Sequence, residues 1–356
     1  MAFGRIERLR LHLICFVFPL LTLFHTLTAP HPWWAAPIPV AIIALAGLLD
    51  VVAGPERRQP AATLPSWVYD GTLYALIALQ LVNVGALLWQ VSRLELTPLD
   101  LAVMTFVTGS CTGYSAIVVA HELVHRREAH LYQLGRLLLL TALYEHFATE
   151  HVRGHHKRIG TPDDPATARH GEWFLAFYAR TVPAQLASAW RLESRRLAKK
   201  PAWQRLLGHR VLQGLVLGWG LVALLALWSP VVALAMVLQA AWAVTFMESV
   251  NYIEHWGLQR QGGRVTVLDS WDTESWWSYY TLVGLTRHAD HHAHASRPYQ
   301  DLRHFEQSIK MPWGYWAMSL GTMFANPVVM RAMDRKLREA GLGPYQGLGT
   351  VSQPGS

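Results

Sequence analysis

The sequence predicts an all-α protein, a six-helix transmembrane bundle with a histidine-rich cap on its cytoplasmic side. Apolar residues make up 52% of the 356 residues and charged residues only 15%, whereas soluble domains carry about 25% charged residues. The apolar residues are gathered into runs of about 20, the length of helix that crosses the hydrocarbon core of a bilayer. Most of the 18 histidines lie between or after these runs.

Six apolar runs are predicted to cross the membrane. The first could be read as a cleavable signal peptide, but no small-residue cleavage site follows it. The aromatic pair Trp33-Trp34 comes next, as is typical of a membrane interface. The predicted spans are residues 11–29, 35–53, 69–91, 99–120, 211–228 and 231–250.

Arginine and lysine are distributed unevenly over the loops between these spans. The loops after spans one, three and five contain a single basic residue, Arg93, and nearly all others lie in the remaining loops. Because cytoplasmic loops collect Lys and Arg, both termini and the catalytic segments 121–210 and 251–356 are predicted to be cytoplasmic. We expect one integral domain over residues 1–356 in a bacterial cytoplasmic (inner) membrane. No nucleic acid is expected as a partner, since no recognition motif accompanies the basic residues.

The two cysteines, Cys15 and Cys111, both lie inside apolar runs. They are too few for a disulfide framework or for an iron–sulfur cluster. If the protein carries out redox chemistry, its electrons must therefore come from a separate protein. The basic residues between Arg191 and Arg210 are a candidate docking face for an acidic electron carrier. Alternatively, they serve only to set the topology.

Nine histidines form four clusters next to the predicted membrane surface. Pairs four residues apart share one face of a helix and can bind one ion. A tetrahedral zinc takes at most four ligands, so nine donors suit two metal ions. Imidazole ligands suit iron, copper or zinc, whereas magnesium and calcium prefer oxygen. The candidate ligands are His121, His125, His151, His155, His156, His255, His288, His291 and His292.

Each cluster also contains a carboxylate. A metal-bound imidazole usually donates its second N–H to an acceptor that orients the ring. The candidates for this role are Glu122, Glu150, Glu254 and Asp290. Each of the four is explained equally well as a charged neighbour.

The first cluster by itself permits a different interpretation. Residues 121–125, HELVH, match HExxH, the zinc metalloprotease motif in which Glu is the general base. An intramembrane protease would need one further ligand and would leave the other histidines without a role. A metal transporter or sensor is another alternative, but the histidines gather beyond the spans and do not follow a path across the bilayer.

Four stretches resemble, in order, the signature regions of the membrane-bound alkane 1-monooxygenases. These are non-haem diiron alkane hydroxylases within the fatty acid desaturase/hydroxylase superfamily. The match includes residues outside the ligand set, such as Asn251, Glu254 and the run Thr161–Pro165. The stretches are HELVHRR from residue 121, EHVRGHHKRIGTPDDPATA from residue 150, NYIEHWGL from residue 251 and LTRHADHHAHASRPYQDLR from residue 285.

The resemblance implies that all nine histidines bind two non-haem iron ions. It further implies O2-dependent hydroxylation of the terminal methyl group of a hydrophobic hydrocarbon, which converts an n-alkane to a 1-alkanol. The implied electron donor is rubredoxin or a ferredoxin, reduced by an NAD(P)H-dependent reductase. The substrate would enter from the lipid bilayer. No substrate-binding residue is assigned.

Two related activities remain as alternatives. Xylene-type monooxygenases, which hydroxylate methyl-aromatic compounds, share much of the pattern. Fatty acyl desaturases commonly show HxxHH in the second cluster, whereas this chain has HxxxHH from His151 to His156, which favours hydroxylation. The chain departs from the usual family pattern at Val152, Trp256 and His294, the last of which is a possible additional ligand.

Overall fold

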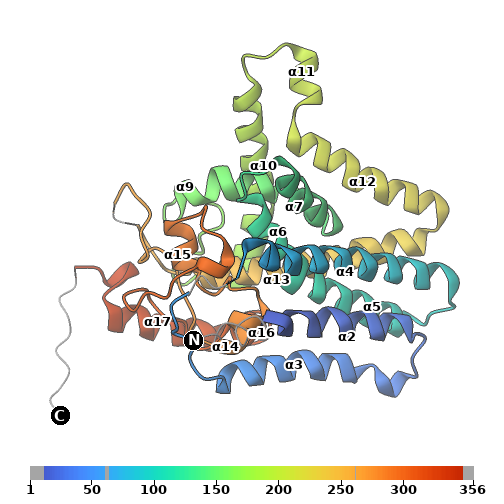
Figure 1. The fold of residues 1–356 in the computed structure, drawn as a ribbon, viewed down its shortest axis with the longest axis horizontal. Coiled ribbons are helices and arrows are strands. Elements are labelled where there is room, and N and C mark those ends of the chain that lie inside the picture. Colours follow the sequence, from blue (N-terminus) through green and yellow to red (C-terminus); the bar gives the residue numbers. More distant parts are fainter. Residues whose placement is uncertain (1–11, 61–63, 261, 348–356) are drawn as a thin grey trace.

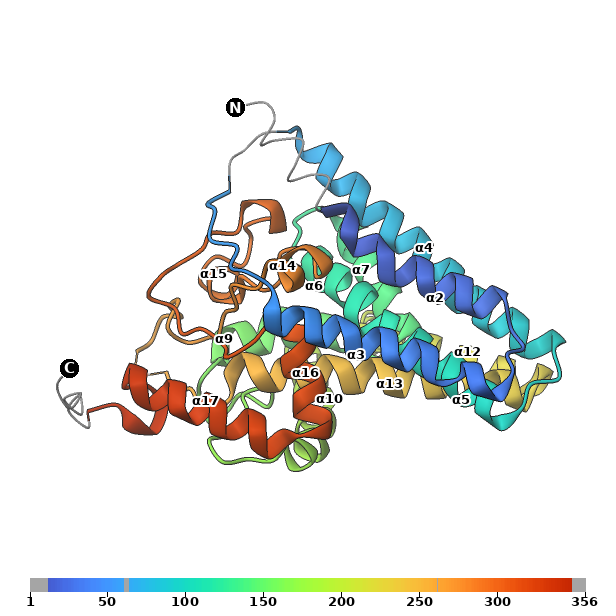
Figure 2. The same ribbon diagram turned by 90° about the horizontal axis from the view of Figure 1, so that it is seen from below.

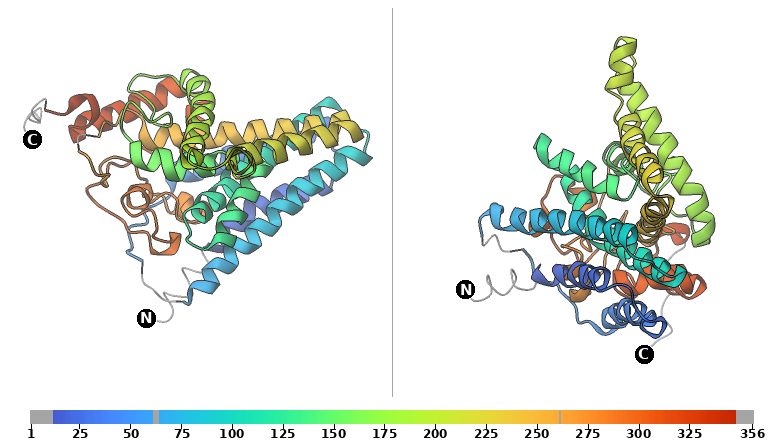
Figure 3. Two further views of the ribbon diagram at one scale, coloured as in Figure 1. Left: turned by 90° about the horizontal axis from the view of Figure 1, so that it is seen from above. Right: turned by 90° about the vertical axis from the view of Figure 1, so that its right-hand side faces the viewer.

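The computed structural model describes residues 12–60, 64–260 and 262–347. This part of the chain is all-helical, with two isolated bridges and no strand. The helices of residues 17–52, 66–111 and 210–255 extend toward one end of the molecule, and many of the loops gather at the other (Figures 1 and 3). The predicted all-α class is confirmed.

The elements fall into two groups by length. The longer helices are α2 (Val17–Leu27), α3 (Pro37–Val52), α4 (Ser66–Arg93), α5 (Pro98–Cys111), α7 (Ala129–Thr141), α10 (Phe174–Leu197), α12 (Arg210–Trp228), α13 (Pro230–His255), α16 (Tyr315–Phe324) and α17 (Asn326–Ala340). The shorter ones are η1 (Leu13–Phe16), η2 (Trp33–Ala35), η3 (Thr112–Ala116), α6 (Ile117–Val124), α8 (Phe147–Glu150), η4 (His151–His155), α9 (His156–Arg158), α11 (Ala202–Leu207), α14 (Trp276–Thr281), α15 (His288–Ala293), η5 (Tyr299–Asp301) and η6 (Gly343–Tyr345). The segments η3 and η4 are π-helical.

Five helical stretches within the described residues are long and apolar enough to cross a membrane: Trp33–Val52, Ser66–Arg93, Pro98–Val124, Arg210–Trp228 and Pro230–His255. They match the second to sixth predicted spans, so the chain is an integral membrane protein. The first predicted span corresponds to the shorter apolar helix Leu13–Leu27, and its residue 11 lies outside the described residues. At 1.5 Å per residue this helix reaches about 22 Å, less than the roughly 30 Å of hydrocarbon. A sixth crossing stays a prediction.

Two spans continue past their predicted C-terminal ends into the candidate site. The fourth continues from residue 120 to Val124, and the sixth continues from residue 250 to His255. Apolar periodicity underestimates these helices because their last turns carry polar residues that are buried under the loops of the cap. His121 and His255 therefore lie on the transmembrane helices themselves, which places their imidazoles directly below the membrane-spanning bundle.

Helices α5 and α13 pack in close contact along a stripe of small residues. A Cβ atom at Gly109 would overlap the Gln239 carbonyl oxygen and Trp242, and one at Gly113 would lie 2.8 Å from the Cβ of Phe246. Small residues allow helix backbones to approach in membranes, where van der Waals packing and hydrogen bonds hold helices together. The glycines of this span therefore serve helix packing.

A polar network ties three helices together at the π-helical segment η3. The Gln80 side chain of α4 donates to the Thr112 hydroxyl oxygen at 2.8 Å, and the Thr112 hydroxyl hydrogen bonds to Gln239 of α13 at 3.1 Å. All three residues are buried, and an unpaired polar group in an apolar medium costs about 2–7 kcal/mol. These bonds fix η3, which carries the residues that precede the first histidine cluster.

The cap is held by two buried aspartates. The Ala289 N–H of α15 donates to Asp272 at 2.8 Å, and the Ser308 hydroxyl donates to the same carboxylate at 2.7 Å. Asp50, near the end of α3, accepts a hydrogen bond from the Ser278 hydroxyl at 2.7 Å. These carboxylates connect the loops that carry the fourth histidine cluster to one another and to the membrane helices.

Candidate metal centre

All nine predicted ligands converge at the junction between the helix bundle and the cap. His121 lies on α6 and His125 caps its end, His255 is the last residue of α13, and the others lie on η4, α9 and α15. Seven of the nine side chains are buried, and His125 and His156 are partly buried. Four segments far apart in the sequence therefore supply one dense cluster of imidazoles.

The potential ligand atoms form three groups in the described part of the chain, of which the last two share His255. Within each group, the atoms lie within 4.8 Å of one another. The first group is His121, His125, His151, His156 and His291. The second is His155, His255 and His292, and the third is Glu254, His255 and His288. Together the groups contain all nine predicted histidines and one carboxylate.

The ring nitrogens face one another at distances that favour a shared cation. The Nε2 atom of His156 lies 3.0 Å from that of His151 and 3.2 Å from that of His291, and the Nε2 atoms of His288 and His292 are 2.8 Å apart. The Nε2 atoms of His121, His125 and His155 are buried without a hydrogen-bond partner among the described residues. Unpaired buried polar atoms are rare, so these orphaned nitrogens fit metal ligands.

Burial keeps the clustered imidazoles neutral. Loss of hydration lowers the pKa of His151, His156, His291 and His292 well below the usual range, and neighbouring imidazoles lower it further. A neutral imidazole has a free lone pair on one ring nitrogen, which is the form that binds a metal. Imidazole with one carboxylate suits a borderline first-row ion such as iron. The donor set therefore fits a non-haem iron site.

The π-helical segment η4 divides the second cluster between two groups. In a π-helix, with its i→i+5 bonds, residues five apart lie on one face. His151 and His156 accordingly meet in the first group, while His155 belongs to the second. His151 and His155, which are four residues apart, fall in different groups, whereas the α-helical period would place them on one face.

One orienting carboxylate was missed by the sequence analysis. The Nδ1–H of His155 lies 2.8 Å from Asp164 Oδ2, which also accepts a hydrogen bond from the Thr167 hydroxyl at 2.7 Å. Burial alone would raise the pKa of Asp164, but His155 and these hydrogen bonds hold it below its usual value. Asp164 lies in the run Thr161–Pro165, which was noted only as part of the resemblance. A loop position has no periodicity that would connect it to His155.

Glu254 is the one predicted carboxylate that lies among the ligand atoms. Its Oε2 is 3.1 Å from Nε2 of His288, and its Oε1 accepts a hydrogen bond from Tyr315 at 2.8 Å. It approaches the nitrogen of His288 that also faces His255 and His292, whereas an orienting acceptor would approach Nδ1. Glu254 is therefore placed as a candidate ligand and not as an acceptor that orients a ring through Nδ1.

The other three predicted carboxylates bind arginines. Glu122 pairs with Arg126, Glu150 with Arg158, and Asp290 with Arg297. Their described hydrogen bonds include none to a predicted ligand histidine, because adjacent residues on a helix point to different faces. Asp290 does accept from Nδ1 of His294, a residue that is 44% exposed and belongs to none of the three groups. These pairs hold the ligand-bearing segments in place.

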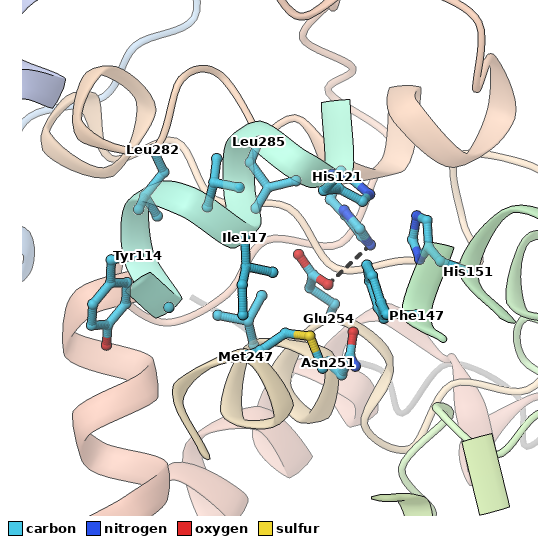
Figure 4. A pocket seen from close by; sticks show the side chains of 14 residues that line it. Tyr114, Ile117, His121, Phe147, His151, Met247, Asn251, Glu254, Leu282 and Leu285 are labelled. Carbon is cyan, nitrogen blue, oxygen red and sulfur yellow. Dashed lines mark ion pairs between the residues drawn. The ribbon is translucent and has the colours of Figure 1, made fainter. Parts of the chain in front are cut away.

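An apolar chamber leads from the bundle to these groups. It lies between helices α6 and α13, η3 and the loop after α14. Figure 4 shows Ile117, Met247 and Leu285 between Tyr114 at one end and the histidines at the other. Its lining residues are Gly113, Tyr114, Ile117, Val118, His121, Phe147, His151, Met247, Val250, Asn251, Glu254, Leu282, Leu285 and His288. A hydrocarbon in this chamber would end on imidazole and carboxylate ligand atoms.

Comparisons with known proteins agree with this arrangement. Residues 97–319 match the profile of the fatty acid desaturase family. The chain is 34% identical over 336 residues to alkane 1-monooxygenase 1 of Pseudomonas aeruginosa, covering 86% of this chain and 84% of that protein. It is 32% identical over 321 residues to alkane 1-monooxygenase of Acinetobacter baylyi, covering 85% and 76%. The xylene/toluene monooxygenase hydroxylase component of Pseudomonas putida is more distant, at 26% over 283 residues, or 77% and 75%. The chain therefore belongs to the alkane 1-monooxygenase family, a group of monooxygenases within the fatty acid desaturase family.

Proposed function

We propose that this protein hydroxylates the terminal methyl group of an n-alkane. The reaction consumes one alkane, one O2, two electrons and two protons, and yields one 1-alkanol and one water. The observation that carries the proposal is the apolar chamber whose inner end consists of His121, His151, His288 and Glu254. An extended chain in this chamber presents its end to the ligand atoms and keeps its interior carbons among Ile117, Met247 and Leu285.

We propose two non-haem iron ions as the cofactor. Two ions account for the division of the donors into a five-histidine group and the remaining donors, with His255 common to the second and third groups. The nine histidines would hold them, with Glu254 as a tenth ligand. When bound, the irons supply O2 activation and the electron transfer to oxygen, chemistry that amino acid side chains do not provide.

The surrounding residues keep the site dry and ordered. The ring of Phe147 stacks on His151, with centroids 4.7 Å apart and planes 23° apart, and covers the chamber side of that ligand. Excluding water strengthens electrostatic interactions within the site and suppresses side reactions. Asp164 holds the ring of His155 through Nδ1, so that Nε2 points to the second group.

We propose that the centre faces the bacterial cytoplasm and takes its substrate from the inner membrane. The distribution of arginine and lysine supports this orientation. Electrons would come from rubredoxin or a ferredoxin served by an NAD(P)H-dependent reductase. Cys15 and Cys111 are buried and form no disulfide, so they offer no internal redox centre.

A surface hollow beside Asp164 is a better docking place for the carrier than residues 191–210. The hollow is lined by Gly160–Thr161, Arg169–His170 and Gly257–Arg260, and it reaches Asp164, one hydrogen bond from His155. Arg169 and Arg260 give its rim positive charge. Helix α11, in the middle of residues 191–210, lies at the tip of a projection away from α15 (Figure 1). The hollow is favoured as the docking place because only Asp164 separates it from His155, a proposed iron ligand.

Methyl-aromatic hydroxylation is the second candidate, because the chain is 26% identical to the xylene/toluene monooxygenase component. One experiment separates the candidates. The purified protein, in lipid nanodiscs with iron, rubredoxin, its reductase and NADH, is given octane, hexadecane and xylene together. We expect 1-alkanols as the main products. Mainly methylbenzyl alcohol would favour the aromatic reading, and alkenes would identify a desaturase.

Metal analysis of the same preparation tests the protease alternative. We expect about two irons per chain. A single tightly bound zinc, together with peptide cleavage, would contradict the monooxygenase proposal. Glu122, which a HExxH protease would use as general base, pairs with Arg126 and accepts from the Tyr299 N–H at 3.3 Å, an arrangement that disfavours that role.

A further inference from the structure

A second apolar hollow lies beyond the end of the chamber. It holds about 690 Å³ between α2, α3 and the aromatic residues of the cap. Phe18, Leu21 and Ile42 line it together with a third hollow further along the same two helices, of about 760 Å³. The side chains of Leu21, Leu45 and Leu49 here are 39–53% exposed, and α3 is part of a stretch that is long and apolar enough to cross a membrane. Figure 2 shows α2 and α3 running beside each other along this side.

One side chain separates the chamber from this groove between α2 and α3. Tyr114 lines both spaces and is buried to 3% exposure. Its ring stacks on that of Trp316, with centroids 3.9 Å apart and planes 23° apart. The histidine groups lie at the opposite end of the chamber (Figure 4). The two stacked rings therefore form the end wall of the chamber.

Hydrogen bonds fix Trp316, and close backbone packing fixes the helical segment that carries Tyr114. The Trp316 N–H of the backbone donates to Asp50 at 2.7 Å, and its indole N–H donates to the Thr281 hydroxyl at 2.9 Å. Tyr114 belongs to the π-helical segment η3, whose neighbouring Gly113 has no room for a Cβ atom against Phe246. The backbone on one side and the indole on the other are fixed, so the phenol ring decides how far the chamber extends.

We propose that the Tyr114–Trp316 stack sets the longest alkane that reaches the metal centre, and that the groove between α2 and α3 accepts the far end of longer chains when the stack is removed. This inference rests on the proposed alkane hydroxylation. A terminal methyl group at the ligand atoms requires the rest of the chain to fit between them and the wall. An alkane longer than the chamber must cross the position of the phenol ring.

Tyr114→Ala tests the wall directly. In nanodiscs, with octane and hexadecane at equal concentration, we expect the ratio of 1-hexadecanol to 1-octanol to rise at least about tenfold, a difference that one or two methylene contacts already produce. Tyr114→Phe is the matched control, because it keeps the stacked ring and removes only the hydroxyl. Its ratio should stay within about twofold of the wild-type ratio.

Ala46→Phe tests the groove independently. Ala46 lines the hollow on α3, beyond the wall. In the Tyr114→Ala background, the added ring should fill the new space and return the product ratio toward the wild-type value. In the otherwise wild-type chain it should leave that ratio unchanged. A ratio that stays high in the double variant would show that long chains do not use this groove.

If Tyr114→Ala does not fold, the same product ratio is measured in Tyr114→Leu, because leucine keeps apolar volume but lacks the flat ring. An unchanged ratio in both variants, with 1-octanol still formed, overturns the inference and leaves the proposed function standing. A wild-type protein that forms no 1-alkanol from either substrate overturns both. The two failures are therefore distinguishable.

Discussion

The two ends of the apolar chamber are built in different ways. The inner end consists of ligand side chains that recur in four short motifs, from His121–His125 to His288–His292. The outer end consists of Tyr114 and Trp316, single aromatic residues that are 202 positions apart in the printed sequence and belong to no motif. The candidate ligands of this site can therefore be predicted from the spacing of residues along the chain, whereas the length of the chamber depends on packing between distant segments.

The largest effect is expected at the inner end. His151→Ala removes one donor from the five-histidine group, and a methyl group cannot bind iron. Loss of a residue that only orients a ligand already lowers metal affinity or activity about 10–100-fold. We therefore expect loss of the donor itself to lower 1-octanol formation by more than about 100-fold and to leave less iron bound per chain. Product analysis and elemental analysis check both. Full activity in this variant would refute the role of the cluster.

A smaller loss is expected from Asp164→Asn. This change weakens the hold on Nδ1 of His155 but removes no ligand, so iron affinity or turnover should fall about 10–100-fold. The matched control is Asp163→Asn, which makes the same charge change at the exposed neighbouring position. Equal effects of the two variants would show that the carboxylate acts by charge alone and does not orient the ring.

The outer end should respond in stability as well as selectivity. Gly113→Ala places a Cβ atom 2.8 Å from that of Phe246, and such overpacking costs about 1–3 kcal/mol. Gly85→Ala on α4 is the control, because nothing lies within 4 Å of its added Cβ. Thermal unfolding in nanodiscs should show a lower transition temperature for Gly113→Ala alone. Equal transition temperatures would argue against close packing of η3 on α13.

The smallest effect is expected from His294→Ala. Its ring belongs to none of the ligand groups in the described residues, and Asp290 retains its ion pair with Arg297 when the imidazole is removed. We expect bound iron to be unchanged and turnover to stay within about twofold, as for most exposed substitutions. Loss of iron in this variant would make His294 an additional ligand and would revise the boundary of the inner end.

The spacing of histidines in the sequence locates the candidate donors but not their grouping. Counting residues placed nine histidines near the membrane surface, and the structure brings all nine together. Glu122, Glu150 and Asp290 are explained from the sequence either as orienting acceptors or as charged neighbours, and the structure pairs them with arginines. A carboxylate beside a histidine in the sequence points to another face of the helix, and the acceptor that does reach Nδ1 of His155 comes from a loop, Asp164.

The sequence by itself determined the helical class, the five long spans and the identity of the candidate ligands, because apolar runs and histidine spacings are local properties of the chain. Only the tertiary structure decided which histidines lie in the same group, that Glu254 stands among the candidate ligand atoms, and where the chamber ends. The π-helical winding of η3 and η4 and the stacking of Tyr114 on Trp316 depend on contacts between distant segments. Those contacts exist only once the helices have packed.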